Sequence, residues 1–191
     1  MVSKAWEQID RIATRSTFRP TDVLITGAGP IGLLAALVGV QRGHHVHVLD
    51  HVTDGPKPQL VRDLGGEYWS GDLTDVPRPD IVIECTGVGQ LVIDAMSHAA
   101  PDGIVCLTGV GSSRQVSVDA GSLNKEMVLE NNVVFGSVNA NRRHWEAATA
   151  ALAGADLSWL ERLVSRRVPL EQWRTALDRQ PTDVKVVLDL A

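Results

Sequence analysis

Short apolar runs alternate along this chain with segments whose apolar residues recur every three or four positions. The apolar runs predict strands over 22–26, 45–50, 67–69, 80–85, 104–109, 132–138 and 184–190, and a short isolated strand over 114–119. The helical spacing predicts helices over 4–15, 30–41, 57–64, 88–99, 123–131, 141–153, 157–164 and 170–179. Such an alternation is typical of βαβ units, in which crossover helices join parallel strands.

Six of these strands, those between 22 and 138, match two mononucleotide-binding halves placed side by side. We therefore predict an α/β fold with a doubly wound parallel sheet over 21–138, and the right-handed crossover rule removes most other connections. A linking helix would occupy 1–20. The helices and strand over 139–191 are more than this sheet requires.

The composition limits which classes of partner and which cellular compartment we expect for this protein. The net charge is −5 and no run of lysines or arginines is present, which argues against nucleic acid because phosphate binding needs a concentrated basic face. The longest apolar stretch, 31–40, is shorter than the about 20 residues of a membrane span. The N-terminus lacks the apolar core of a secretion signal, so we expect a cytoplasmic protein without a membrane partner. Cys85 and Cys106 lie in apolar runs and are expected to be buried thiols.

The stretch TGAGPIG follows the first predicted strand and opens the next helix. Gly27 permits a sharp turn, Gly29 permits close approach of a pyrophosphate, and Gly32 permits close packing of the helix on the strand. Pro30 suits the first helical turn, where a missing N–H costs nothing. The free N–H groups at this helix end favour a diphosphate. The alternative is a parallel-sheet turn without a ligand.

Asp50 ends the second strand, eighteen residues beyond Gly32. A carboxylate in this place can accept hydrogen bonds from both hydroxyls of an adenosine ribose, whereas a 2′-phosphate would meet like charge. No arginine stands beside it in the sequence, so we predict NAD as the cofactor and NADP as the poorer one. His51 leaves the alternative open, because a protonated imidazole would favour a phosphate.

Two further strand ends carry candidate cofactor contacts. Thr86 and Gly87 follow one strand and Gly109 and Val110 follow the next, at the edge where open α/β sheets bind ligands. Plain turn chemistry is the alternative. Four histidines invite a metal interpretation, but no thiol or carboxylate completes a ligand set, so solvated or edge histidines are expected; they are His44, His45, His47 and His51. Asp72 stands four residues after the single tyrosine, so the Tyr-x-x-x-Lys pair of short-chain dehydrogenases is missing, and the sequence nominates no catalytic residue and no metal ligand.

The stretches VLITGAGPIGLLAAL, DIVIECTGVG, GIVCLTGV and KVVLDL together resemble the cofactor half of medium-chain, zinc-type alcohol dehydrogenases. The stretch VDAGSLNKEMVLENNVVFGSVNANRRHWEAA is similar to the C-terminal region of archaeal-type glucose 1-dehydrogenases. In that family a GroES-like catalytic domain, which holds the zinc ligands and much of the sugar pocket, comes first. The resemblance implies that the chain lacks this domain and that 139–191 returns toward it, with a final strand whose partner is gone.

The resemblance also implies roles for particular residues. The pyrophosphate would lie on the glycine turn, whose residues are Gly27, Gly29, Pro30, Ile31 and Gly32. Asp50 and His51 would face the adenosine ribose, and the cofactor would be lined further by Thr86, Gly87, Gly109 and Val110. Ser137 and Asn139 would lie near the nicotinamide, and Asn139 would also touch the sugar. Segment 115–119 matches one that pairs across a two-fold axis in the wider family, so we expect a homodimer.

We therefore expect the NAD-binding domain of a zinc-dependent, glucose 1-dehydrogenase-like oxidoreductase. The complete enzyme would transfer hydride from the C1 hydroxyl of an aldose to nicotinamide, with zinc bound outside this chain, and this chain alone would be inactive. A stand-alone nucleotide-sensing module is the alternative function. An inert structural domain is a third, and it predicts no response to a dinucleotide.

Overall fold

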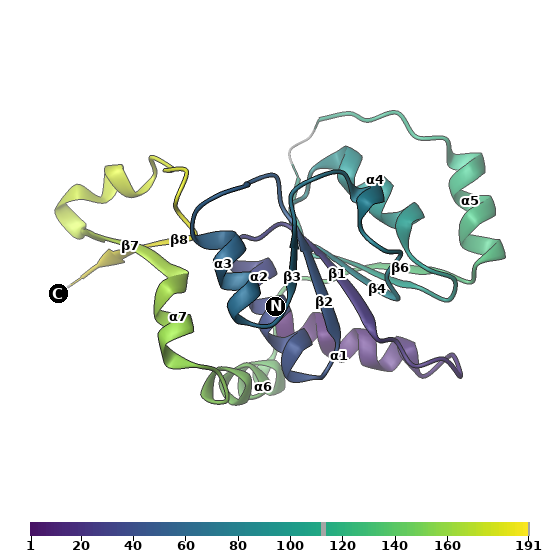
Figure 1. The fold of residues 1–191 in the computed structure, drawn as a ribbon, viewed down its shortest axis with the longest axis horizontal. Coiled ribbons are helices and arrows are strands. Elements are labelled where there is room, and N and C mark those ends of the chain that lie inside the picture. Colours follow the sequence, from purple (N-terminus) through teal and green to yellow (C-terminus); the bar gives the residue numbers. More distant parts are fainter. Residues whose placement is uncertain (112–113, 191) are drawn as a thin grey trace.

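The computed structural model describes residues 1–111 and 114–190 of the chain (Figure 1). Six parallel strands form one sheet in the order β3-β2-β1-β4-β5-β6. They are β1 (Asp22–Thr26), β2 (His45–Leu49), β3 (Glu67–Trp69), β4 (Ile81–Glu84), β5 (Ile104–Leu107) and β6 (Val133–Gly136). The order turns back on itself between β1 and β4, which confirms the doubly wound α/β sheet predicted from the sequence.

Helices cover both faces of this sheet, which is why its central strands are apolar at nearly every position. The helices before β6 are α1 (Val2–Ala13), α2 (Pro30–Gln41), α3 (Pro56–Asp63), α4 (Gly89–His98) and α5 (Ala120–Leu129), with a 3₁₀ turn η1 (Leu73–Asp75). One core cluster joins Val23 and Ile25 of β1 to α1, α2 and α3. The alternate residue Leu24 lies in a second cluster with Ala95 of α4 on the opposite face.

The N-terminal helix belongs to this core. Trp6 of α1 is fully buried, and its indole nitrogen donates to the carbonyl of Ala35 in α2. His44 stacks on the Trp6 ring at 5.2 Å, and the Arg42 guanidinium lies 5.0 Å from the ring centre. The predicted linking helix therefore packs on the sheet as one of its covering helices.

The chain beyond β6 forms α6 (Arg142–Ala153), α7 (Leu157–Leu163), β7 (Val164–Pro169), a 3₁₀ helix η2 (Leu170–Ala176) and β8 (Lys185–Asp189). Strands β7 and β8 pair in parallel as a separate sheet, which extends away from the large sheet in Figure 1. We call residues 164–190 the C-terminal lobe. Ala191, the last residue of the predicted C-terminal segment, lies outside the described residues.

Three predictions about local structure are wrong. The last strand keeps a partner within the chain, because 164–169 forms β7 beside it. The helix predicted over 170–179 is the shorter η2, which ends at Ala176. Residues 114–119 form no strand, because no other strand of the described chain lies alongside to pair with them. Among the described residues, no helix is long and apolar enough to cross a bilayer.

Candidate functional site

The glycine turn joins β1 to α2 at the carboxyl edge of the sheet. Gly27 has a φ of +91°, and a Cβ there would lie 2.8 Å from Cγ2 of Thr86. A Cβ on Gly32 would lie 1.8 Å from the Gly27 carbonyl oxygen, so α2 can approach the turn only with glycine at that position. Pro30 occupies the first turn of α2, as expected for a residue without an N–H.

Gly29 differs from these two glycines. A Cβ on Gly29 would meet nothing within 4 Å, so neither packing nor backbone strain in this structure requires glycine there. The open space belongs to a cavity of about 640 Å³ that Gly27, Gly29, Asp50, His51 and Thr86 all help to line. The first N–H groups of α2 have no intrahelical partner, and the helix end carries partial positive charge. A ligand with a diphosphate therefore fits the cradle beside Gly29.

Asp50 lies at the end of β2 and is buried, with a side chain 5% exposed. Its Oδ2 accepts a hydrogen bond from the Ala28 N–H at 2.7 Å and lies 2.9 Å from Nζ of Lys57. Its Oδ1 accepts from the Val52 N–H at 3.1 Å and lies 3.3 Å from Nδ1 of the exposed His51. Asp50 thus ties the glycine turn to the start of α3.

The charge of Asp50 is compensated internally. Burial acts to raise the pKa of this carboxyl, but the Lys57 ammonium and the N–H groups of Val52 and Ala28 outweigh burial and hold the pKa below its ordinary value. Lys57 is itself buried, with a side chain 4% exposed. The prediction took a 2′-phosphate to meet like charge at Asp50 because no arginine stands beside it in the sequence, but Lys57 supplies a cation there. The preference for NAD stays a prediction, without that premise.

The loops after β4 and β5 contact each other beside the glycine turn. Glu84 is fully buried at the end of β4 and accepts hydrogen bonds from the N–H groups of Thr86 at 2.7 Å and Gly87 at 3.0 Å. Gly87 has a φ of +68°, and a Cβ there would lie 2.5 Å from the Gly111 nitrogen. A Cβ on Gly109 would lie 2.2 Å from the Gly87 nitrogen. These glycines allow two strand ends to meet, with Thr86 placed on the cavity.

The remaining predicted site residues lie along the same edge of the sheet but line none of the cavities described. Val110 follows β5 and is 89% exposed. Ser137 follows β6 and is buried, and its Oγ has no hydrogen-bond partner in the described chain. Asn139 is exposed, with a φ of +64°. The structure therefore gathers predicted residues after β1, β2 and β4 into one cavity and leaves those after β5 and β6 outside its lining.

Sequence reasoning missed two cations that border this cavity. Lys57 reaches Asp50 from the first turn of α3, and Arg179 comes from the loop between η2 and β8 in the C-terminal lobe. Lys57 carried a local signal, because a lysine at the start of the helix after an acidic strand end lies within reach of that carboxylate. Arg179 carried none, since only the placement of the C-terminal lobe brings it to this edge.

The histidines and cysteines singled out in the sequence form no catalytic or metal site in the described part of the chain. His47 is buried rather than solvated or at an edge, and Trp69 donates a hydrogen bond to its Nδ1 at 3.2 Å. Cys106 is buried as expected, whereas Cys85 is half-buried and lines the cavity, and burial raises the pKa of both thiols to about 12. Among residues 1–111 and 114–190, no group of three or more His, Cys, Asp or Glu side chains could hold a metal ion. The site as described can bind and orient a phosphate-containing ligand.

Comparisons with known proteins agree with this fold. The family described as "Glucose dehydrogenase C-terminus" matches residues 1–190. The chain belongs to this family. It is 37% identical over 182 residues to glucose 1-dehydrogenase 1 of Caldivirga maquilingensis, covering 93% of this chain and 52% of that protein. It is 34% identical over 202 residues to glucose 1-dehydrogenase of Methanocella arvoryzae, covering 100% of this chain and 56% of that protein.

A solved structure of a relative has the same fold over almost the whole of this chain. The glucose dehydrogenase of Haloferax mediterranei, in complex with NADP, zinc and gluconolactone, superimposes with a TM-score of 0.88 at 29% identity. The match covers 99% of this chain and 56% of that one. The chain thus spans about half the length of the relatives it matches.

Proposed function

We propose that this chain is the dinucleotide-binding half of a zinc-dependent, glucose 1-dehydrogenase-like oxidoreductase. One observation carries the proposal: the open cradle at Gly29, at the N-terminus of α2, faces a cavity that also receives Asp50 and Thr86. The family match over 1–190 and the NADP complex of the Haloferax relative support it. The binding domain would be 21–138, with 1–20 preceding it and 139–191 returning toward a GroES-like domain.

The residues of this chain would bind and orient the cofactor. The backbone N–H groups at the start of α2 would hold the pyrophosphate, close to Gly29 and with Pro30 and Ile31 at its edge. The loop from Asp50 to His51 would face the adenosine ribose, and Thr86, held by Glu84, would border the middle of the cofactor. Ser137, whose buried Oγ has no hydrogen-bond partner among the described residues, would lie near the nicotinamide.

Bound nicotinamide dinucleotide supplies the hydride acceptor, and in the complete enzyme the zinc polarises the sugar C1 hydroxyl. The zinc ligands would lie outside this chain, and Asn139 would reach toward the sugar. The contribution of this half is to fix the cofactor and to exclude water from one side of it. We propose that both NAD and NADP bind, because Lys57 compensates the charge of Asp50.

Calorimetry on the 191-residue chain with NAD and NADP tests this function. Gly29→Ala adds a methyl group where nothing lies within 4 Å, so its thermal unfolding should stay close to that of the wild type, apart from the modest cost of alanine at the N-cap of α2. The methyl group would stand where the pyrophosphate approaches, so we expect affinity for both dinucleotides to fall about tenfold or more. Gly154→Ala adds the same group outside the cavities, 3.7 Å from its nearest contact, and should bind as the wild type does. A wild-type chain that binds neither dinucleotide contradicts the proposal.

We also propose that a second copy of the chain pairs through 115–119. Val116 and Val118 are each 38% exposed in an extended segment that pairs with no strand of the described chain. Two antiparallel copies of this segment would satisfy each other's backbone groups. Light scattering should show a dimer, and Val116→Pro should weaken it because proline removes an N–H donor. A chain that is monomeric, and unchanged by Val116→Pro, would contradict this.

A further inference from the structure

The loop that joins η2 to β8 lies against the candidate cofactor cavity. Arg179 of this loop lines the cavity of about 640 Å³ that also holds Asp50 and Thr86. It lines a second one of about 590 Å³ with His51 and Thr53. A third, of about 300 Å³, joins Arg179 to Gly29. One side chain of the C-terminal lobe therefore borders the site from the end of β2 to the glycine turn.

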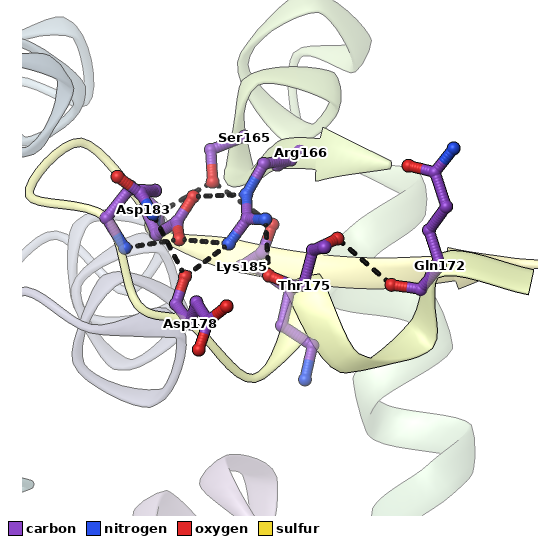
Figure 2. Close-up of polar contacts among 9 residues, drawn as sticks. Ser165, Arg166, Gln172, Thr175, Asp178, Asp183 and Lys185 are labelled. Atoms are coloured by element: carbon purple, nitrogen blue, oxygen red, sulfur yellow. Dashed lines mark hydrogen bonds and ion pairs between the residues drawn. The ribbon is translucent and has the colours of Figure 1, made fainter. Parts of the chain in front are cut away.

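A single arginine holds this loop in place (Figure 2). Arg166 of β7 makes a two-pronged ion pair with Asp183, with Nε to Oδ1 at 3.1 Å and Nη2 to Oδ2 at 2.7 Å. The same guanidinium donates to the carbonyls of Thr175 at 2.8 Å and Asp178 at 3.0 Å. Asp183 also accepts a hydrogen bond from the Gln180 N–H at 2.8 Å. Arg179 lies between residues tied down on both sides.

The electrostatics of this hub keep it ionised. The hydrogen bond from Arg166 holds the pKa of the Asp183 carboxyl below its ordinary value, and the N–H of Gln180 adds to that effect. The same pairing raises the pKa of Arg166. Arg179 itself is exposed; its charge helps to lower the pKa of Asp183, but none of the residues that the structure describes gives its side chain a hydrogen bond or an ion pair at contact distance. Its guanidinium is available to a ligand in the cavity.

We propose that Arg179 binds the 2′-phosphate of NADP, so that the C-terminal lobe completes the cofactor site. This inference rests on the proposed function. Two of the three cavities that Arg179 lines lie at the end of β2, where the adenosine ribose would sit beside Asp50 and His51. Lys57 borders the same cavities but is already paired with Asp50. Among the described residues that line these cavities, Arg179 is a cation with no hydrogen bond or ion pair at contact distance, and its planar fork matches the oxygens of a phosphate.

Asp183 and Arg166 act as positioning residues in this account, because they hold the loop but do not line the ribose end of the site. The pairing also helps to hold the short two-stranded sheet together at the edge of the molecule. It fixes the start of β8 against β7, so that the preceding loop turns toward the glycine turn.

Calorimetry with NADP, NAD, 2′-AMP and 5′-AMP tests the proposal. Arg179→Gln should weaken NADP and 2′-AMP about tenfold or more, the effect of losing a charge-assisted hydrogen bond, and should change NAD and 5′-AMP less than about twofold. Salt should weaken NADP binding to the wild type more steeply than NAD binding, and Arg179→Gln should remove this difference. Arg179→Lys should retain part of the affinity. The matched control is Arg174→Gln, because Arg174 stacks on Trp173 at 5.4 Å and lines none of the three cavities.

The outcomes separate this proposal from the function on which it rests. Equal losses for NAD and NADP would place Arg179 on the pyrophosphate and overturn the assignment to the 2′-phosphate. An unchanged NADP affinity in Arg179→Gln would overturn the role of Arg179, while dinucleotide binding by the wild type would still support the proposed function. If the wild type binds neither dinucleotide, both the role of Arg179 and the proposed function are contradicted.

The positioning role has its own readout. Asp183→Asn should lower the NADP affinity, and adding Arg179→Gln to it should cost little more, because the two residues act on the same contact. Fully additive losses would show that Asp183 does not act through Arg179.

Discussion

The six-stranded sheet and the C-terminal lobe are stabilised by different kinds of interaction. In β1 and β4 the central residues are fully buried, and apolar burial on both faces carries the stability. In the lobe only Val168 and Val184 are buried among the apolar residues, while the Arg166 guanidinium supplies four hydrogen bonds. Burial gives the sheet a rigid edge on which to build a cradle. A polar hub gives the lobe a defined place beside that cradle although few of its apolar side chains are buried.

The difference assigns separate tasks to the two regions. The sheet supplies the features of the site that depend on backbone geometry, including the turn at Gly27 and the close contact of Gly87 with Gly109. The lobe supplies a charged side chain. A change in the sheet should therefore alter folding of the whole chain, whereas a change in the hub should alter the lobe and the charge it presents to a ligand.

The largest effect should come from the sheet core. Ile25 is fully buried in β1, so Ile25→Ala should lower the free energy of unfolding by about 2–5 kcal/mol. Urea denaturation followed by circular dichroism measures this loss. Leu188→Ala in β8 is the matched control, because this side chain is 41% exposed and its truncation should cost about 1 kcal/mol or less. Similar losses in both variants would refute the contrast between the two regions.

The next effect should be local to the lobe. Asp183→Asn removes the charge that pairs with Arg166, so amide exchange in β7 and β8 should speed up while exchange in β1 and β4 stays slow. Cys106 reports on the sheet independently, because it is fully buried in β5 and burial raises the pKa of its thiol to about 12, which keeps it unreactive in the folded chain.

Cys106 provides the control for that experiment. Asp183→Asn should leave the labelling rate of this thiol unchanged, and Ile25→Ala should raise it. Faster labelling in Asp183→Asn would mean that the lobe and the sheet unfold together, and the two regions would then be one cooperative unit.

The smallest effect should appear on mild acidification. Burial, and then the charge of Arg42, lowers the pKa of His44, which stacks on Trp6. The unfolded chain takes up a proton at His44 near pH 6.5 while the folded chain does not, so unfolding becomes easier as the pH falls below about 6.5. The pKa of Asp183 is lowered instead, so its contribution is present above about pH 4 and is lost only below it.

Denaturation at pH 7 and pH 5 checks this difference. The wild type should lose stability at pH 5, and His44→Gln should lose less. Protection of β7 and β8, measured relative to the global stability, should stay constant over the same interval. A pH dependence that His44→Gln does not reduce would contradict the role given to this imidazole.

The regions also differ in how far the sequence predicted them. Buried parallel strands read as continuous apolar runs, so all six strands of the large sheet were found, and the glycines and Asp50 were placed at its edge. The partners of Asp50 were not, because the ion pair with Lys57 depends on where α3 begins. Strand β7 was missed because the two consecutive arginines, Arg166 and Arg167, and Pro169 interrupt its apolar pattern. Arg179 could not be found locally, since its position depends on a hub formed by residues far from the glycine turn.

Amide hydrogen exchange on the 191-residue chain, with and without saturating NADP, tests the central claim most directly. If the cofactor lies between the sheet and the lobe, protection should rise in two separate segments, the turn over 27–32 and the loop over 176–184. Amide protection in the rest of the lobe, including β8, should change little. No change in either segment, or protection of the glycine turn with none in the loop, would contradict the account.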